Sequence, residues 1–190
     1  AKAESCIVTT PYENLHILPS SLDLAAAELE ISDKKGRESI LKNALLPIKQ
    51  YYDYIIIDCP PSLGLITTNA LTASDTFLVP IQCEYYALEG LTQLMSTVRR
   101  IKRQYNNTID IEGVLLTMYD GRLNLTQQVV EEVKKFFPRK VFKTVIPRGV
   151  RLSEAPSFGM PVIYYDKNCK GSITYTELAK EIIAKERSYE

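Results

Sequence analysis

Short apolar runs alternate with longer helical stretches along almost the whole chain, and this alternation limits the folds that the sequence can adopt. The strands that we predict from the apolar, β-branched runs are Tyr54–Asp58, Thr76–Ile81, Gly113–Met118 and Val141–Ile146. Apolar residues at helical spacing lie between these runs, most clearly over Glu84–Tyr105. Strands and helices that alternate in this way build crossover units. We therefore predict an α/β fold with a doubly wound, mostly parallel sheet and helices on both faces.

The other predicted elements are shorter or less regular. We expect extended segments at Asn14–Pro19 and Pro161–Tyr165. Further helices are predicted at Leu22–Ile31, Arg37–Tyr51 with a bend at Pro47, Leu63–Ala73, Leu125–Phe137 and Ile173–Lys185, with one or two helical turns at Val150–Ser157. The sequence shows no internal repeat, low-complexity stretch or linker, so residues 1–190 are predicted to form a single domain.

The charge and cysteine content exclude several classes of protein. Lys and Arg together number 23, as do Asp and Glu, so a DNA site on this chain must be a local patch. The cysteines are far apart and form no CxxC pair, which argues against a zinc or iron–sulfur site and suits a reducing cytoplasm. The sequence has no apolar signal segment and no stretch that would span a bilayer. We therefore expect a cytoplasmic protein without a membrane anchor.

Unusual loops follow three of the predicted strands, at the positions where ligands bind in parallel α/β sheets. Asp58 is followed by CPPSLG, Met118 by YDGRLN, and Ile146 by PRGVRLSEAP. We expect these loops to lie along one edge of the sheet. Among the eight glycines the closest two are Gly113 and Gly121. Neither GxxxxGK[ST] nor GxGxxG, the motifs whose backbone wraps phosphates, is therefore present.

Asp58 has two interpretations from its local sequence alone. Apolar and aromatic residues lead into the acid, and a rigid Pro-Pro pair follows soon after it. This arrangement is typical of a Walker-B-type carboxylate, which supports a magnesium-bound water beside a nucleotide phosphate. The alternative is a helix N-cap or a solvated strand end.

Several long segments resemble one family in their order and spacing. They are YENLHILPSSLDLAAAELE, YDYIIIDCPPSLGLITTNAL, LVPIQCEYYALEGLTQL, GVLLTMYDGRLNL and KTVIPRGVRLSEAPSFGMPVIYYD. These segments resemble the ParA/Soj family of chromosome and plasmid partitioning ATPases, over nearly the whole chain from Tyr12 to Ala184. In that family the first strand, a deviant Walker A loop and the first switch lie upstream of these five segments. The resemblance implies that the phosphate-binding loop belongs to an N-terminal portion outside this chain.

The resemblance also implies which residues contact the nucleotide and its metal. Asp58 matches the Walker B acid, which holds magnesium through a water, and Cys59–Gly64 matches the second switch. Pro147 matches a residue that lines the adenine pocket. Gly149 stands where the family usually has Asn, so a base or ribose contact from that side chain is missing here, although the backbone remains.

Two arginines match residues that the family uses for sequence-independent DNA binding, namely Arg122 and Arg151. Such binding needs cations on phosphates rather than base readout, so two small patches in a dimer would suffice. From the local sequence alone, Arg122 is a solvated loop residue and Arg151 forms a salt bridge with Glu154 at a helix start. The basic run Arg99–Arg103 is either a solvated helix end or an auxiliary DNA contact.

The function that the resemblance implies is an ATP-driven partitioning switch. ATP and Mg²⁺ would be held in a homodimer that binds double-stranded DNA on the nucleoid, and a ParB/Spo0J-like protein would stimulate hydrolysis. The chain by itself lacks the phosphate cradle and is expected to be inactive. Strands next to the missing first strand are expected to expose unpaired backbone groups and apolar faces.

Two alternatives to this function differ in class. One is a degenerate, non-hydrolysing module of the same fold that binds DNA or a partner. The other is a membrane-associated ATPase of the MinD type, which usually ends in a basic amphipathic helix. The segment ELAKEIIAKERSYE mixes acids among its bases, and this argues against membrane anchoring.

Overall fold

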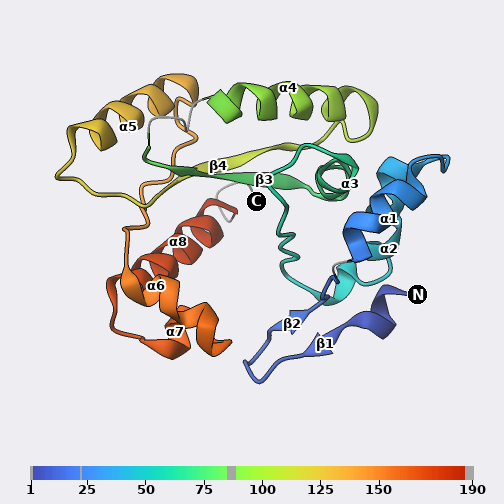
Figure 1. Cartoon of the computed structure of the whole chain (residues 1–190), viewed down its shortest axis with the longest axis horizontal. Coiled ribbons are helices and arrows are strands. Elements are labelled where there is room, and N and C mark those ends of the chain that lie inside the picture. Colours follow the sequence, from blue (N-terminus) through green and yellow to red (C-terminus); the bar gives the residue numbers. More distant parts are fainter. Residues whose placement is uncertain (1, 22, 85–88, 187–190) are drawn as a thin grey trace. The chain divides into compact units, whose positions relative to one another are not determined.

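The structure, a computed structural model, describes residues 2–21, 23–84 and 89–186. These residues form two compact units, each built from two stretches of chain. Unit 1 comprises Ala1–Thr76 and Leu94–Asp110, and unit 2 comprises Phe77–Gln93 and Ile111–Glu190. The elements are labelled in Figure 1. The expected class is confirmed: the fold is α/β, with parallel strand pairing and helices.

Unit 1 is mostly helical. Its elements are η1 (Ala3–Cys6), β1 (Val8–Thr9), β2 (His16–Ile17), α1 (Asp23–Ile31), η2 (Arg37–Ser39), α2 (Ile40–Leu45), η3 (Lys49–Tyr51) and α3 (Leu65–Ala73). β1 and β2 pair antiparallel, with Val8 opposite Ile17. The helix predicted over Arg37–Tyr51 is interrupted at Pro47, as expected, because proline cannot donate a helical hydrogen bond. It consists of η2 and α2 before Pro47 and η3 after it.

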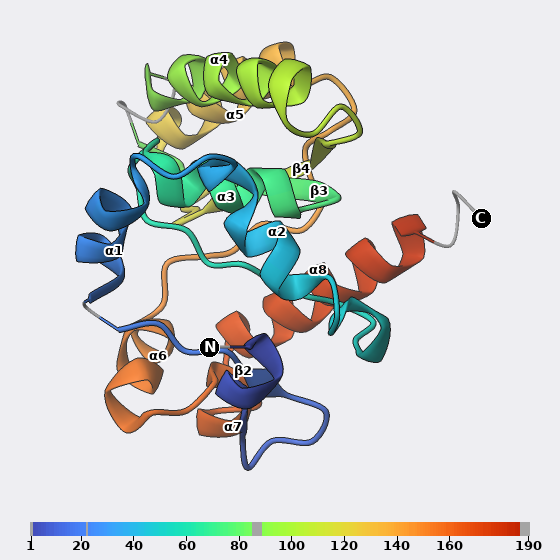
Figure 2. The same ribbon diagram turned by 90° about the vertical axis from the view of Figure 1, so that its right-hand side faces the viewer.

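Two buried asparagines hold the helices of unit 1 together. Asn69 of α3 accepts a hydrogen bond from the Leu41 N–H and donates to the Arg37 carbonyl, which explains why α2 and η2 pack against α3 in Figure 2. Asn106 donates to the carbonyls of Leu71, Thr72 and Ser74 at the end of α3. Both amides thus bond to backbone groups near the ends of helices, where such groups lack partners within the helix.

The strand predicted at Tyr54–Asp58 is wrong. The segment is extended, but no residue from 53 to 63 pairs with a described strand. Ile56 is 91% exposed, whereas Ile57 packs on a small core around Leu45 and Ile48. A run of β-branched residues becomes a buried strand only where neighbouring strands take its backbone hydrogen bonds, and no described strand pairs with this segment.

Unit 2 contains the parallel sheet. β3 (Thr76–Gln82) pairs with β4 (Asp110–Thr117), and α4 (Glu89–Gln104) lies between them in the sequence. Part of each of these three elements is assigned to unit 1. Its other elements are α5 (Asn124–Phe136), α6 (Val150–Glu154), η5 (Ala155–Phe158), α7 (Val162–Tyr165) and α8 (Lys170–Glu186). Figure 1 shows α5 on one side of the sheet and α8 on the other. Val114, Leu115 and Leu116 are accordingly buried in succession.

The segment predicted as a fourth strand, Val141–Ile146, is only partly a strand. It lies along β4 and forms isolated parallel bridges from Val141 to Val114 and from Pro147 to Tyr119. Between these bridges the N–H groups of Lys143 and Thr144 donate to the Glu181 carboxylate of α8, at 2.8 and 2.9 Å. A side chain therefore takes the hydrogen bonds that a continuous ladder would use.

The extended segment predicted at Pro161–Tyr165 is also wrong, because these residues form the short helix α7 after Pro161. Proline suits the start of a helix, where its missing N–H costs nothing. Tyr165 stacks on Phe158 at 5.0 Å between ring centroids, a tertiary contact that favours the helical turn. Within the part of the chain that the structure describes, every helix is too short or too polar to cross a membrane.

We predict that Asn106→Ala destabilises the protein by about 2–3 kcal/mol, because three carbonyls near a buried side chain lose their donor. The matched control is its exposed neighbour, Asn107→Ala, which should change the free energy of unfolding by less than about 0.5 kcal/mol. Urea unfolding followed by circular dichroism measures both. Equal stabilities of the two variants would contradict the assigned role of Asn106.

Candidate functional site

The carboxyl end of the sheet in unit 2 carries the candidate site. Cys83, after β3, donates its N–H to Thr117 at the end of β4, and Tyr119 donates to Ile146 at 3.0 Å. Together with the bridge to Pro147, these contacts bring the loops after β4 and after Ile146 to one edge. The structure thus joins two of the three loops that were expected to meet. The third loop, after Asp58, belongs to unit 1.

Arg122 is fixed by the acid two residues before it. Its Nε donates to Asp120 Oδ1 at 2.9 Å and its Nη2 to Oδ2 at 2.7 Å, while the Arg122 N–H also donates to Oδ1. The hydrogen bonds from Arg122 and a smaller charge effect from Arg148 lower the pKa of Asp120 to about 2. Since the Arg122 side chain is 90% exposed, the guanidinium edge away from Asp120 faces solvent.

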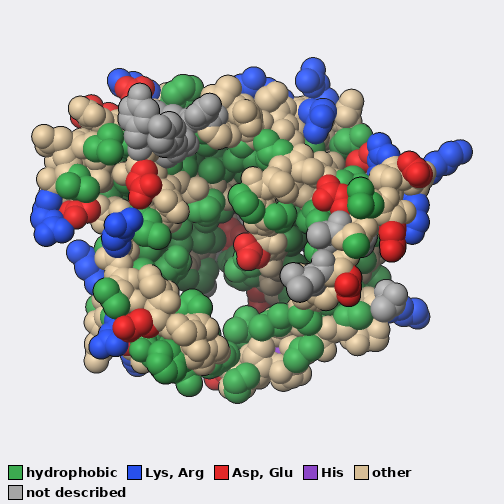
Figure 3. Space-filling model, viewed as in Figure 1, with side chains coloured by type: hydrophobic (Ala, Val, Ile, Leu, Met, Phe, Trp, Pro, Cys, Tyr) green, Lys and Arg blue, Asp and Glu red, His purple; other side chains and the backbone are tan. Residues whose placement is uncertain are grey.

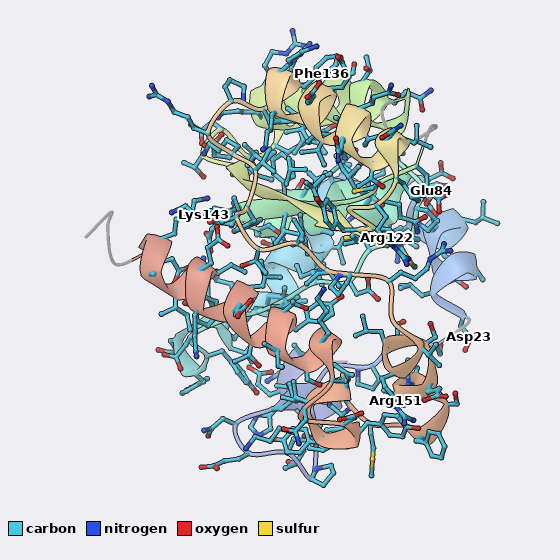
Figure 4. All side chains as sticks on the ribbon, turned by 90° about the vertical axis from the view of Figure 1, so that its left-hand side faces the viewer. Asp23, Glu84, Arg122, Phe136, Lys143 and Arg151 are labelled. Carbon is cyan, nitrogen blue, oxygen red and sulfur yellow. The ribbon has the colours of Figure 1, made fainter. Side chains whose placement is uncertain are left out.

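The same edge carries a second ion pair. Arg148, directly after Pro147, contacts Glu84 at 3.4 Å. Glu84 follows β3 and Arg148 follows the segment on the other edge of β4, so this pair reaches across the end of β4. Figure 4 shows Glu84 and Arg122 at this end of the sheet. The edge therefore alternates acidic and basic side chains, in keeping with the zero net charge of the chain.

Arg151 lies in α6, within a cluster of acidic and aromatic groups. Its Nη1 donates to Glu154 Oε2 at 2.9 Å, and its Nε lies 3.4 Å from Asp166 Oδ2. The guanidinium also lies over the Tyr165 ring, 5.9 Å from its centroid. Hydrogen bonding to Glu154, above all, raises the pKa of Arg151. The salt bridge to Glu154 that the sequence offered as an alternative is present, and the arginine remains 55% exposed.

The two residues expected near adenine lie at the same edge of unit 2. Pro147 is partly buried beside Tyr119, and Gly149 precedes α6 with an extended backbone, φ −155°. A Cβ built on Gly149 would meet Leu152 at 3.7 Å, an ordinary van der Waals contact. The position does not require glycine, so an Asn side chain such as the family usually has here would fit.

Asp58 lies in the exposed, extended part of unit 1, where no other described residue forms a hydrogen bond or ion pair with its carboxylate. The described residues also contain no cluster of three or more acidic, histidine or cysteine side chains that would hold a metal ion unaided. Mg²⁺ commonly takes one or two carboxylates and completes its shell with water and substrate phosphates. A single accessible carboxylate fits that chemistry.

The end of the expected second switch borders a cavity of about 580 Å³ within unit 1. Glu28 of α1 reaches the start of α3 there, and its Oε1 accepts a hydrogen bond from the Leu65 N–H at 2.5 Å. A Cβ on Gly64 would lie 2.5 Å from the same oxygen, so a larger residue there would displace the Glu28 side chain from Leu65. Among the predicted site segments, Cys59–Gly64 reaches this cavity, and so does Arg100 of the basic run.

Comparisons with known proteins agree on one group. A family model described as an AAA domain matches residues 1–111. "Sporulation initiation inhibitor protein Soj" of Bacillus subtilis is 60% identical over 178 residues, 94% of this chain and 70% of that protein. "Chromosome-partitioning ATPase Soj" of Treponema pallidum is 48% identical, over 98% of this chain and 74% of that protein. Cobyrinic acid a,c-diamide synthase from Mycobacterium smegmatis, solved with ADP and magnesium, is 32% identical with a TM-score of 0.85, over 100% of this chain and 70% of that one.

A parallel sheet with helices on both faces and charged loops at its carboxyl edge defines a P-loop NTPase-like α/β protein. The family model and the similar proteins then identify the family within this class. The chain belongs to the ParA/Soj family of chromosome-partitioning ATPases.

Several residues of the site are absent from the sequence-based prediction. Asp120 could have been found, because an acid two residues before an arginine in a turn is a local signal. Asp166 could not, since it is fifteen positions from Arg151 and was placed at the end of a strand that does not exist. Glu84 and Arg148 meet only through the pairing of the sheet.

We predict that Arg122→Gln raises the pKa of Asp120 from about 2 toward its ordinary value of 3.8, while Arg148→Gln raises it less. A lowered carboxyl pKa stabilises the fold above the pKa of the unfolded chain, and this stabilisation disappears as pH falls toward 2. Carbon-13 NMR titration of the Asp120 carboxyl measures both shifts. A larger rise in the Arg148 variant would show that the bidentate pair does not dominate.

Proposed function

We propose that this chain is part of an ATP-driven partitioning switch that binds duplex DNA without sequence preference. The observation that carries the proposal is the exposed guanidinium of Arg122, which is held at the carboxyl edge of the sheet. Arg151, also exposed, lies in α6. Guanidinium groups on loops suit phosphate contacts, which supply nonspecific affinity. The lack of any excess of basic residues is compatible with this role because only a few contacts are needed in each protomer of a dimer.

The nucleotide would be ATP with Mg²⁺, contacted by Asp58, Pro147 and Gly149. Asp58 would accept hydrogen bonds from a water of the metal shell, and its freedom from protein partners among the described residues supports this role. Pro147 offers an apolar ring and Gly149 a backbone to the base. When bound, the metal would neutralise phosphate charge. The cobyrinic acid a,c-diamide synthase solved with ADP and magnesium supports this assignment by similarity.

The remaining parts of the proposal follow from family membership. We propose a homodimer that acts on the nucleoid in the cytoplasm and is stimulated by a ParB/Spo0J-like protein, with residues 1–190 as one ATPase domain. The Treponema pallidum relative that is named for chromosome partitioning supports this role. The basic run Arg99–Arg103 remains a candidate auxiliary DNA contact, because no described acid pairs with Arg99 or Arg100.

The DNA assignment predicts that Arg122→Ala and Arg151→Ala each weaken binding of a mixed-sequence duplex by roughly three- to tenfold at low salt. Each should also reduce the slope of log K against log salt by roughly one. Fluorescence anisotropy with a labelled duplex measures both quantities. The matched control is Lys134→Ala, an exposed cation of α5 outside the site, which should change affinity by less than about twofold. Equal losses in all three variants would contradict a specific role for the two arginines.

The 190-residue chain contains no GxxxxGK[ST], so we expect it to show no magnesium-dependent ATP turnover by itself. A coupled phosphate-release assay tests this, with Asp58→Asn as the matched variant. Turnover that Asp58→Asn abolishes would show that another part of the chain cradles the phosphates.

A further inference from the structure

The two arginines at the proposed DNA site differ in their acidic surroundings. Arg122 faces one carboxylate, Asp120, so the pair is locally neutral. Arg151 faces two, with Glu154 at 2.9 Å and Asp166 at 3.4 Å. The Arg151 cluster therefore carries a net charge of −1 where a DNA phosphate would have to approach. Its side chain is also less exposed, 55% against 90%.

The geometry shows that these acids are held in place independently of Arg151. Asp166 Oδ1 accepts hydrogen bonds from the N–H groups of Asn168 and Cys169 at the start of α8, which leaves Oδ2 for the arginine. Glu154 Oε2 also accepts a hydrogen bond from the Tyr165 hydroxyl. Both carboxylates are thus positioned before any ligand arrives, and each competes with phosphate for the same guanidinium.

We propose that Glu154 and Asp166 act as an intramolecular restraint on DNA binding, because both carboxylates compete with a phosphate for the Arg151 guanidinium. This inference rests on the proposed DNA-binding function and adds a residue-level control to it. An exposed ion pair contributes little free energy, so replacing a carboxylate by a phosphate at Arg151 costs little. The restraint therefore weakens DNA binding without preventing it. A phosphate also meets the repulsion of whichever carboxylate remains.

The test uses substitutions that remove charge and keep shape. Asp166→Asn retains an oxygen that accepts hydrogen bonds from Asn168 and Cys169 in the turn before α8, and Glu154→Gln retains an acceptor for Arg151. We expect each to tighten binding of a labelled mixed-sequence duplex by roughly three- to tenfold and to make the salt slope steeper, by up to roughly one. The matched control is Glu132→Gln, which removes the same charge from an exposed pair with Lys135 and should change affinity by less than about twofold.

The double variant Arg151→Ala with Asp166→Asn decides whether the effect passes through Arg151. The restraint predicts that Asp166→Asn changes affinity by less than about twofold once Arg151 is absent. An equal gain with and without Arg151, or no gain in either acid variant, overturns the inference while the losses in Arg122→Ala and Arg151→Ala keep the DNA assignment intact. Failure of the wild-type chain to bind DNA overturns the assignment and the inference together.

A second measurement separates restraint from a purely structural role. The Arg151 Nε–H resonance in nitrogen-15 NMR should shift when duplex is added to the wild-type chain, as the carboxylate partner is exchanged for phosphate. In Asp166→Asn the free protein should already lack the ion-pair shift. An Arg151 resonance that does not move with saturating DNA would contradict partner exchange.

Discussion

The pairing of β4 with a neighbour on each side is the constraint on which unit 2 depends. β3 takes one edge of β4, and the segment from Val141 to Pro147 takes the other through parallel bridges. Gly113 allows this close approach, because a Cβ there would lie 2.5 Å from the Phe142 ring. Once β4 is fixed on both edges, the chain that leaves it must turn at the carboxyl rim. The turn at Asp120 and Arg122 is the direct result.

Burial on both faces of the same strand explains why the loops, rather than the sheet, carry the charges. Val114 is fully buried, and Leu115 packs with Phe142, Ile146 and Leu178 of α8. A charged side chain in these positions would lose its hydration without a partner. On the face shown in Figure 3, Lys and Arg side chains are scattered among acids and apolar groups. Local ion pairs therefore decide where a polyanion would bind.

Sequence reasoning succeeded where structure is set by nearby residues. The strands at β3 and β4 and the helices from α1 to α8 were placed within a few positions, apart from α7, because apolar spacing and turn residues are local signals. It failed where residues far along the chain determine whether a segment forms a strand. Tyr54–Asp58 has the composition of a buried strand but pairs with no described strand, and Lys143 and Thr144 donate their N–H groups to Glu181. The same holds for the candidate site. Arg122 and Arg151 were predicted from the sequence, but Asp166 was not, because it reaches Arg151 only through the fold of α7.

A chain with equal numbers of acids and bases has no long-range field that would draw it to DNA, so the nearest carboxylates determine what each arginine can do. One carboxylate orients Arg122 and leaves its outer edge in solvent, which prepares the group for a phosphate. Two carboxylates around Arg151 go further, because they contact both its Nη1 and its Nε. The first arrangement favours capture of a phosphate and the second opposes it. For the proposed DNA-binding function, having both arrangements would favour release of DNA as well as binding, because neither arginine then holds a phosphate strongly.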